Sequence, residues 1–525
     1  MVITRKPART FRPVAVFATL AIFAAACGGG KEALKPGELD PDTVLRYAYD
    51  LESGITNLDP AISTNTCDKN IWSFIYDTLL RSDGNGNVLP HVATEWELAQ
   101  DAKTLSLTLR DDVKYHDGTA LTAQTVQQGI EYLQSNTNLT DIAMIESFET
   151  PDATHIVMHL KDARAQSLLF ALAGQDGMLV APSAFGKAAE KPAGAGPFTF
   201  QSFERGQSLV VIRNPNYWDA EHWKLEAIQF VQAAFGPPAV QRFQANEADV
   251  AKFLGDSYEV ASKLPNAEIA TALSGEYAQL EFRLTSVARG DTPFAKLGVR
   301  QAINHAIDRE KINEVIENGL GEVTWQHFNS DSPFHLDDLD NAYPYDPEKA
   351  KQLLAEAGYP DGFEFEMVIP GGVQNMENQG LIVQEQLAEV GIKATIVRSL
   401  PTNIAVEYYI QKVGEMFSAR ELATIFAPSM LSNWATGEFV AIHDGAENAE
   451  MTRIRDAAYA ATGEEMADLL AEGERYASAN ALDVPIYHAP QYMVWNAQRV
   501  GGTPVTPADA CTPIGLRDVY IKSGK

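Results

Sequence analysis

The 525-residue sequence has little cysteine and little positive charge. Its three cysteines are Cys27, Cys67 and Cys511, and their spacing fits no metal-binding pattern, so no metal site is predicted from them. The 41 lysines and arginines are outnumbered by 70 aspartates and glutamates, which gives a formal net charge of −29. This balance argues against a nucleic-acid partner and indicates a strongly acidic, soluble surface.

Long apolar runs and catalytic motifs are also missing from the body of the chain. After residue 26 no segment approaches about 20 consecutive apolar residues, so we expect no second membrane pass. There is no Gly-x-Ser-x-Gly elbow, phosphate-binding loop or His-Glu-x-x-His motif. We therefore predict no catalytic residue, no cofactor and no metal ligand. Structural roles are expected for the scattered histidines His116, His305, His327, His335 and His488.

The N-terminus has the plan of an export signal. Four basic residues (Arg5, Lys6, Arg9 and Arg12) precede an apolar and small-residue run from Val14 to Ala26. Cys27 and three glycines follow, which resembles a bacterial lipoprotein processing site. Removal of residues 1–26 takes the net charge to about −33. We expect Cys27 to be lipidated and residues 27–41 to form the linker to the anchor, although cleavage without lipidation stays open, since Ala24 stands where the pattern usually has a branched aliphatic residue.

The two remaining cysteines raise the question of a disulfide. Exported proteins keep disulfides, so a bond between Cys67 and Cys511 is one prediction. Two separate buried thiols are the alternative, because the sequence cannot bring their Cα atoms within bonding range.

The chain from residue 42 onward alternates strands and helices, which predicts a mixed α/β fold. Residues Leu105–Leu109 alternate apolar and polar residues as a strand, and Thr122 can cap the helix that follows. Asp308 and Asp346 are placed to cap two later helices, of which the second ends at Gly358. A strand-helix-strand unit is then predicted, with Phe363–Ile369, Met376–Val390 and Ile392–Val397 as its parts.

Six short blocks in compatible order resemble the bacterial extracellular solute-binding proteins, family 5, which serve oligopeptide, dipeptide and nickel ABC importers. The blocks are LDPA with YDTLL (residues 58–61 and 76–80), LR with VKYHDGTAL (109–110 and 113–121), GAGPF (194–198), RNPNYW (213–218), VRQAINHAIDR (299–309) and YDPEKAKQLLAEAGYPDG (345–362). Most of these residues set turns, caps or apolar cover, so they specify a fold and not a ligand.

This resemblance implies a two-lobed, hinged clamp of the periplasmic-binding-protein type (class II), whose first lobe has an extra subdomain. A ligand that contacts both lobes only when they close shifts the equilibrium toward the closed state. The domain borders expected by analogy are 42–85, 201–285 and 481–525 for the first lobe, 86–200 for the extra subdomain, and 286–480 for the second lobe.

The sequence departs from the peptide-binding pattern in the segment Glu415–Pro428, which contains no aspartate. Many peptide-binding relatives carry there an aspartate that pairs with the peptide's amino group. Glu421 is the nearest substitute, but Arg420 beside it favours an anion, as does Arg283 in the strand Tyr277–Leu284. We therefore predict that Arg283 and Arg420 bind a ligand carboxylate. The alternative is that both arginines pair with acids such as Glu281 or Glu421.

Aromatic and first-lobe residues complete the predicted site, because organic ligands bind in mostly apolar pockets. Trp325 and Trp434 are the main aromatic candidates, and Tyr277, Phe417 and Tyr492 are weaker ones, with core packing as the alternative for each. In the first lobe we predict Asn65, with Asp68 nearby, although a simple turn would also explain them.

Together these features predict a monomeric lipoprotein that binds a small organic solute, either a peptide or another compound bearing a carboxylate. Its expected partners are ABC permease subunits and the membrane that holds its anchor. Two alternatives remain: a sensory or adhesion lipoprotein with the same clamp, and a secreted hydrolase. A nickel chelate is also conceivable as the ligand of such a family.

Overall fold

A computed structural model describes residues 40–522 except for 41, 53–54, 56, 64–67, 83–86, 137–138, 235, 254, 287–289, 401–402, 423–426, 436–448, 462 and 505–514. The range Leu39–Lys525 is one compact unit. Within the described residues, no helix combines the length and the apolar character that crossing a membrane requires.

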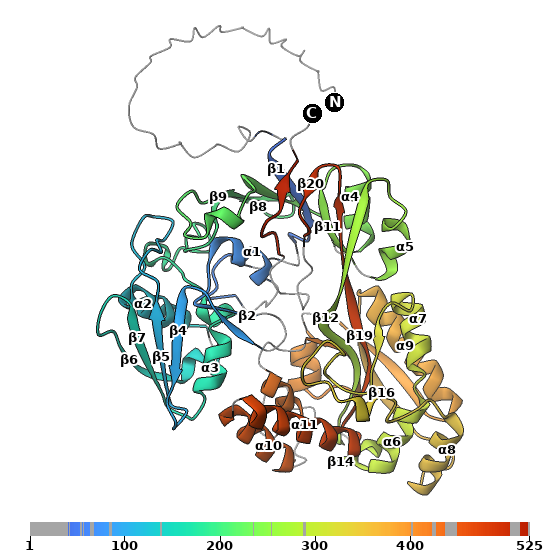
Figure 1. The fold of residues 1–525 in the computed structure, drawn as a ribbon. Helices are drawn as coiled ribbons and strands as arrows, with labels where there is room; N and C mark the ends of the chain where they lie inside the picture. The colour runs from blue at the N-terminus through green and yellow to red at the C-terminus, as the bar shows by residue number, and fades with distance from the viewer. Residues whose placement is uncertain are drawn as a thin grey trace, which may run out of the picture. The chain divides into compact units, whose positions relative to one another are not determined.

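An eleven-stranded mixed sheet organises this unit (Figure 1). Its strand order is β17-β16-β18-β12-β19-β11-β1-β10-β9-β8, with β15 beside β19. The strands are β1 (Val44–Tyr49), β8 (Phe198–Glu204), β9 (Ser208–Arg213), β10 (Ala227–Gln232), β11 (Val250–Phe253), β12 (Ala267–Phe282), β15 (Glu322–Val323), β16 (Glu364–Pro370), β17 (Lys393–Ser399), β18 (Met416–Leu422) and β19 (Asp483–Asn496).

The long strands β12 and β19 pair antiparallel along the sheet (Figure 1) and contribute side chains to several hydrophobic cores. The first half of β12, up to Leu273, pairs with Pro490–Asn496, next to β11. Its second half, from Tyr277, pairs with Asp483–His488 on one side and with β18 on the other. Between Leu273 and Tyr277 the register shifts, so that three residues of β12 stand opposite one of β19. The irregularity therefore lies where the sheet passes from one core to the next.

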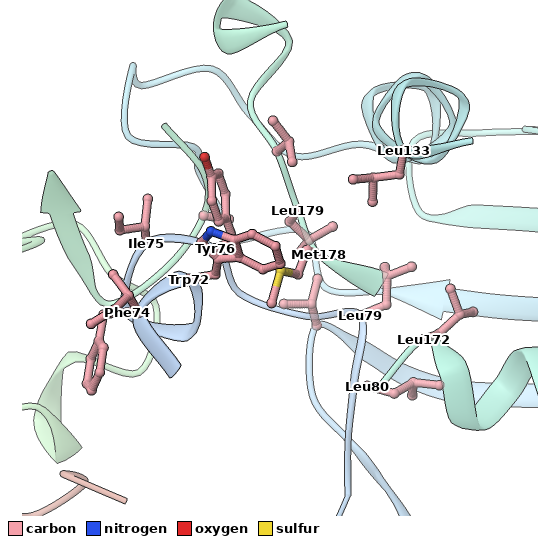
Figure 2. Close-up of a cluster of buried hydrophobic side chains, with 14 of the residues drawn as sticks. Trp72, Phe74, Ile75, Tyr76, Leu79, Leu80, Leu133, Leu172, Met178 and Leu179 are labelled. Carbon is pink, nitrogen blue, oxygen red and sulfur yellow. The ribbon is translucent and has the colours of Figure 1, made fainter. Parts of the chain in front are cut away.

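One core joins the long sheet to a separate antiparallel sheet of order β4-β5-β7-β6. Figure 2 shows part of it, where Trp72 and Tyr76 at helix α1 (Lys69–Ile75) lie among Leu79, Met178 and Leu179. The separate sheet and its helices are β4 (Ala93–Leu98), β5 (Thr104–Leu109), β6 (Ile145–Glu149), β7 (His155–Leu160), α2 (Ala123–Leu133) and α3 (Ala165–Ala171). All of them fall inside the range 86–200.

The second core lies where β12, β16 and β18 meet the helices that follow β12. These helices are α6 (Leu297–Ala306), α7 (Arg309–Glu317), α8 (Pro347–Glu356) and α9 (Gln374–Glu389). A third cluster gathers around α10 (Ala449–Ala460) and α11 (Gly463–Ala479). The remaining main elements are β2 (Leu80–Ser82), β3 (Val88–Pro90), α4 (Pro237–Gln244), α5 (Tyr258–Ala261), β13 (Thr285–Ser286), β14 (Gly290–Asp291), the π-helical segment η9 (Ala405–Ile410), β20 (Val500–Gly501) and β21 (Tyr520–Ile521).

The helix ends predicted from the sequence are confirmed. Thr122 accepts a hydrogen bond from the Thr125 backbone at the start of α2. Asp308 and Asp346 do the same for α7 and α8. The predicted strand-helix-strand unit is also confirmed as β16, α9 and β17, with β16 and β17 parallel.

A buried carboxylate explains why two of the six sequence blocks occur together. Asp77, from the block YDTLL, accepts hydrogen bonds from Tyr217 Oη at 2.8 Å and Trp218 Nε1 at 3.1 Å, both from the block RNPNYW. His91 Nε2 binds its other oxygen. Burial would raise the pKa of Asp77, but the His91 charge and these hydrogen bonds outweigh it and lower that pKa. These blocks therefore hold the fold together.

Candidate ligand-binding site

An aromatic cluster brings two of the predicted site residues together. Tyr277 on β12 lies edge-on to the His327 ring at 5.2 Å, and His327 lies edge-on to Trp434 at 4.5 Å. Tyr277 also contacts His488, its partner on β19, at 6.0 Å between ring centres. All four side chains are buried. Tyr277 and Trp434 thus share one buried hydrophobic cluster with residues of α10 and α11.

His327 is the charged centre of this cluster. Its Nδ1 lies 3.1 Å from Glu474 Oε2 and its Nε2 lies 3.0 Å from Asp483 Oδ2. Trp434 Nε1 donates to the same Asp483 oxygen at 3.1 Å. Burial alone would lower the pKa of His327, but the two carboxylates outweigh it and raise that pKa to about 10. The imidazolium therefore bridges β19 to α11 at neutral pH. Burial, followed by the charge of His327, lowers the pKa of His488 to about 3.

A second polar cluster surrounds Arg420 on β18. Its guanidinium forms an ion pair with Glu317 at the end of α7, donates to Tyr487 Oη at 2.7 Å, and lies 3.5 Å from Glu276 Oε1. The side chain of Arg420 is only 3% exposed. Burial would lower the pKa of Arg420, but Tyr487, Glu276 and Glu317 raise it well above its usual value. Its one positive charge is therefore matched by two carboxylates.

Arg420 and Tyr277 lie on opposite faces of the sheet. Arg420 is paired with Ala278 on β12, and successive residues of a strand point to opposite sides. Arg283 follows β12 directly and has the parity of Tyr277, so it lies on the opposite side from Arg420. One carboxylate cannot bind both guanidiniums, and the two predicted arginines do not form one anion site.

Arg283 lies against η9. Its guanidinium donates to the Tyr408 carbonyl and its carbon Cζ lies 4.4 Å from the centre of the Tyr408 ring. The side chain is buried, and its backbone N–H donates to the Glu415 carbonyl at 2.9 Å. These contacts hold the Arg283 side chain against the segment that carries Tyr408.

Trp325 and the weaker aromatic candidates are separate from the Tyr277 cluster. Trp325 is half-buried, donates through Nε1 to the Tyr343 carbonyl at 3.0 Å and packs under Arg309. Phe417 lies in a small core with Tyr408 at 5.1 Å. Tyr492 stacks on Phe253 at 5.1 Å, in the core beside α4. Core packing thus describes Phe417 and Tyr492 in this state.

Of the two residues predicted for the first lobe, Asp68 is the one that the structure describes. This fully buried carboxylate accepts from Ser63 Oγ at 2.5 Å and from the Asn57 backbone at 3.2 Å, and so ties the preceding loop to α1. Asn65, Cys27, Cys67 and Cys511 lie outside the described residues, as does the side chain of Glu421.

Several residues of these clusters escaped the sequence analysis. Glu317 lies 103 positions from Arg420 in the sequence, and Glu474 and Asp483 lie 147 and 156 positions from His327. No local pattern marks such pairs. A weak signal was present for His327, which lies two positions after the candidate Trp325 in the same loop-like stretch.

Two groups of side chains among the described residues have the spacing of a metal site. In one, Asp219 already pairs with Arg517 at 2.8 Å, beside Glu221 and His222. In the other, His335 is grouped with Asp337 and Asp340, and its Nδ1 lies 3.1 Å from the Phe328 carbonyl. Both groups lie outside the clusters described above.

Comparison with known proteins agrees with this architecture. NikA from Brucella suis, solved in complex with Fe(III)-EDTA, superposes with a TM-score of 0.79 over 92% of this chain and 100% of its own, at 20% identity. The fold is that of the two-lobed periplasmic binding proteins. Residues 87–437 match the family model for bacterial extracellular solute-binding proteins, family 5 (middle region). The chain belongs to this family, whose members are non-catalytic substrate-binding proteins of ABC importers.

Two curated relatives are similar along most of the chain. The glutathione-binding protein GsiB of Pectobacterium atrosepticum is 25% identical over 353 residues, which are 66% of this chain and 67% of the relative. The oligopeptide-binding protein AppA of Bacillus subtilis is 25% identical over 415 residues, 72% of this chain and 74% of the relative.

Proposed function

We propose that this protein captures a small organic solute, a peptide or another carboxylate-bearing compound, and delivers it to the permease subunits of an ABC importer. It acts as a monomer without catalysis. It is exported and held at the outer face of the cytoplasmic membrane by lipid on Cys27.

The observation that carries this proposal is that β12 and β19 pack into different cores before and after their register shift. Residues on either side of the register shift pack into different hydrophobic interiors. Bending at that point moves one core relative to the other without breaking either. The borders predicted at residues 285 and 480 remain predictions. The shift itself, between Leu273 and Tyr277, is our candidate for the hinge.

The chemistry of the ligand is proposed from the relatives and from the site residues. The names of the similar proteins point to glutathione and oligopeptides, which carry both amides and carboxylates. For the carboxylate we propose Arg283, because it lies on the same side of the sheet as Tyr277, whereas Arg420 lies on the opposite side and pairs with Glu317 and Glu276. Tyr277 and Trp434 are proposed as the apolar wall, and Trp325 and Asn65 remain candidates.

Thermal unfolding of the mature chain with a panel of reduced glutathione, tripeptides and small carboxylic acids tests this function. A saturable rise in Tm with at least one compound is expected, with the compound recovered unchanged. Turnover of a panel compound would instead support the hydrolase alternative. The sensory or adhesion alternative would be favoured by two results together. No compound stabilises the protein, and its gene lies apart from genes for permeases and ATPases.

A further inference from the structure

Among the described residues, the buried amide side chains of Gln326, Gln386 and Asn313 bind the backbone in the same way. Gln326 accepts from the Leu336 N–H at 2.8 Å and donates to the Leu336 carbonyl at 2.9 Å. Gln386 does the same with Asp308, at 3.1 and 3.3 Å, and Asn313 with Gly321, at 3.0 and 2.9 Å. In each case the amide oxygen and nitrogen meet the N–H and C=O of a single residue. This pairing satisfies the donor and the acceptor at once.

Gln491 on β19 is as deeply buried but has no such partner. Its side chain is 1% exposed, and within the described part of the chain neither Oε1 nor Nε2 has a hydrogen-bond partner. Leaving both ends of a buried amide unmet costs about 1–3 kcal/mol for each group. A glutamine at this position therefore destabilises the folded protein, unless a group outside the chain forms hydrogen bonds with its amide.

The position of Gln491 connects it with the proposed hinge. It is paired with Ala272, one residue before Leu273, where the register of β12 and β19 begins to shift. It shares its face of β19 with Met493 and Trp495, which belong to the first core. The amide thus lies at the end of that core nearest the junction with the second.

We propose that Gln491 binds the N–H and C=O of one residue of a peptide ligand, as Gln326 binds those of Leu336. This inference rests on the proposed function and makes it more specific. An amide-bearing ligand satisfies both ends of the Gln491 side chain. A simple carboxylate only accepts hydrogen bonds, so it would leave the Gln491 oxygen unmet. The ligand class is therefore peptide-like and not merely acidic.

The stability of the ligand-free mature chain, refolded from denaturant, tests the premise. Gln491→Leu should keep or raise the Tm, because leucine of similar volume removes two unmet polar groups. Gln326→Leu, the matched control, should lower the Tm, because it orphans the Leu336 N–H and C=O. A clear loss of Tm in Gln491→Leu would overturn the proposal, since it would mean that the protein itself or a bound water already satisfies the amide.

Calorimetric titration with reduced glutathione, trialanine and citrate tests the ligand class. The wild-type chain should bind at least one of the two peptides, and Gln491→Leu should bind that peptide at least tenfold more weakly. Any citrate affinity should stay unchanged. Equal peptide affinity in both proteins, or wild-type binding of citrate alone, overturns this inference but leaves the proposed function standing. A wild-type chain that binds none of the three and retains no compound from the cell contradicts both.

Discussion

Arg420 and Glu317 form a buried ion pair that joins β18 to the last turn of α7. The sequence suggested acids such as Glu281 or Glu421 as partners of the two arginines; among the described side chains, those paired with Arg420 are Glu317 and Glu276. The pair lies on the face of the sheet that is covered by the helices of the second core. Its location indicates that the ion pair stabilises the fold and does not bind the ligand.

Replacing Arg420 should therefore destabilise the protein. Arg420→Met leaves the buried carboxylate of Glu317 without its counter-charge, which should lower the free energy of unfolding by about 3–5 kcal/mol. Urea denaturation measures this change. The double variant Arg420→Met, Glu317→Leu should recover most of the loss. Arg453→Met, which breaks only an exposed ion pair with Glu450 and Glu472, should cost at most about 1 kcal/mol. A single Arg420 variant as stable as the wild type would refute this assignment.

Arg283 is the residue proposed to bind the ligand carboxylate. Arg283→Ala is expected to weaken binding of a carboxylate-bearing ligand such as glutathione at least tenfold, because a desolvated guanidinium contact is worth about 1.4 kcal/mol or more. Calorimetric titration gives the affinity. Arg398→Ala, which removes an exposed pair with Glu377, is the control and should leave binding unchanged. Equal affinity in Arg283→Ala and the wild type would remove Arg283 from the site.

The His327 bridge predicts a definite dependence of stability on pH. The folded-state pKa of His327 is raised to about 10, above its ordinary value of about 6.5. Its contribution is therefore complete below pH 6.5 and is lost as the pH rises through 10. Urea denaturation from pH 6 to pH 10 should show a fall in the wild type that is smaller in His327→Gln. Parallel curves for the two proteins would mean that His327 is not held as the imidazolium.

Asp176, in the short helical turn Gln175–Gly177, predicts a second pH effect. Burial, followed by the charge of Asp141, raises the pKa of Asp176 to about 7. A raised carboxyl pKa makes the folded state progressively less favourable from about pH 4 to pH 7. Asp176→Asn keeps the acceptor for the Ile142 N–H and removes this ionisation. Its Tm should exceed that of the wild type at pH 8 by roughly 1–3 °C and match it at pH 4. A lower Tm at pH 8 would contradict this account.

The lipid anchor is tested at Cys27. Growth with a labelled fatty acid should mark the wild-type chain, and Cys27→Ser should carry no label and leave the membrane fraction. Cys67→Ser serves as the matched control and should be labelled normally. Release of an unlabelled wild-type chain would indicate cleavage without lipidation.

The parts of the fold that were predicted correctly depend on contacts between residues close together in the sequence. The caps at Thr122, Asp308 and Asp346 are contacts within three residues, so the sequence alone contains them. The strand-helix-strand unit likewise follows from periodicity over short windows. The candidate site was harder to predict from the sequence. Tyr277 and Trp434 were proposed singly, but the residues that bring them together, His327 and Asp483, meet through contacts of more than 150 positions.

The most direct test of the central claim is native mass spectrometry of the mature protein, purified gently from its own cells. We expect a monomer that carries one small organic molecule. Its mass and fragmentation should identify a peptide or another amide-bearing acid, and added peptide should displace it. A monomer that carries nothing, and that neither glutathione nor any tripeptide occupies, would contradict this claim.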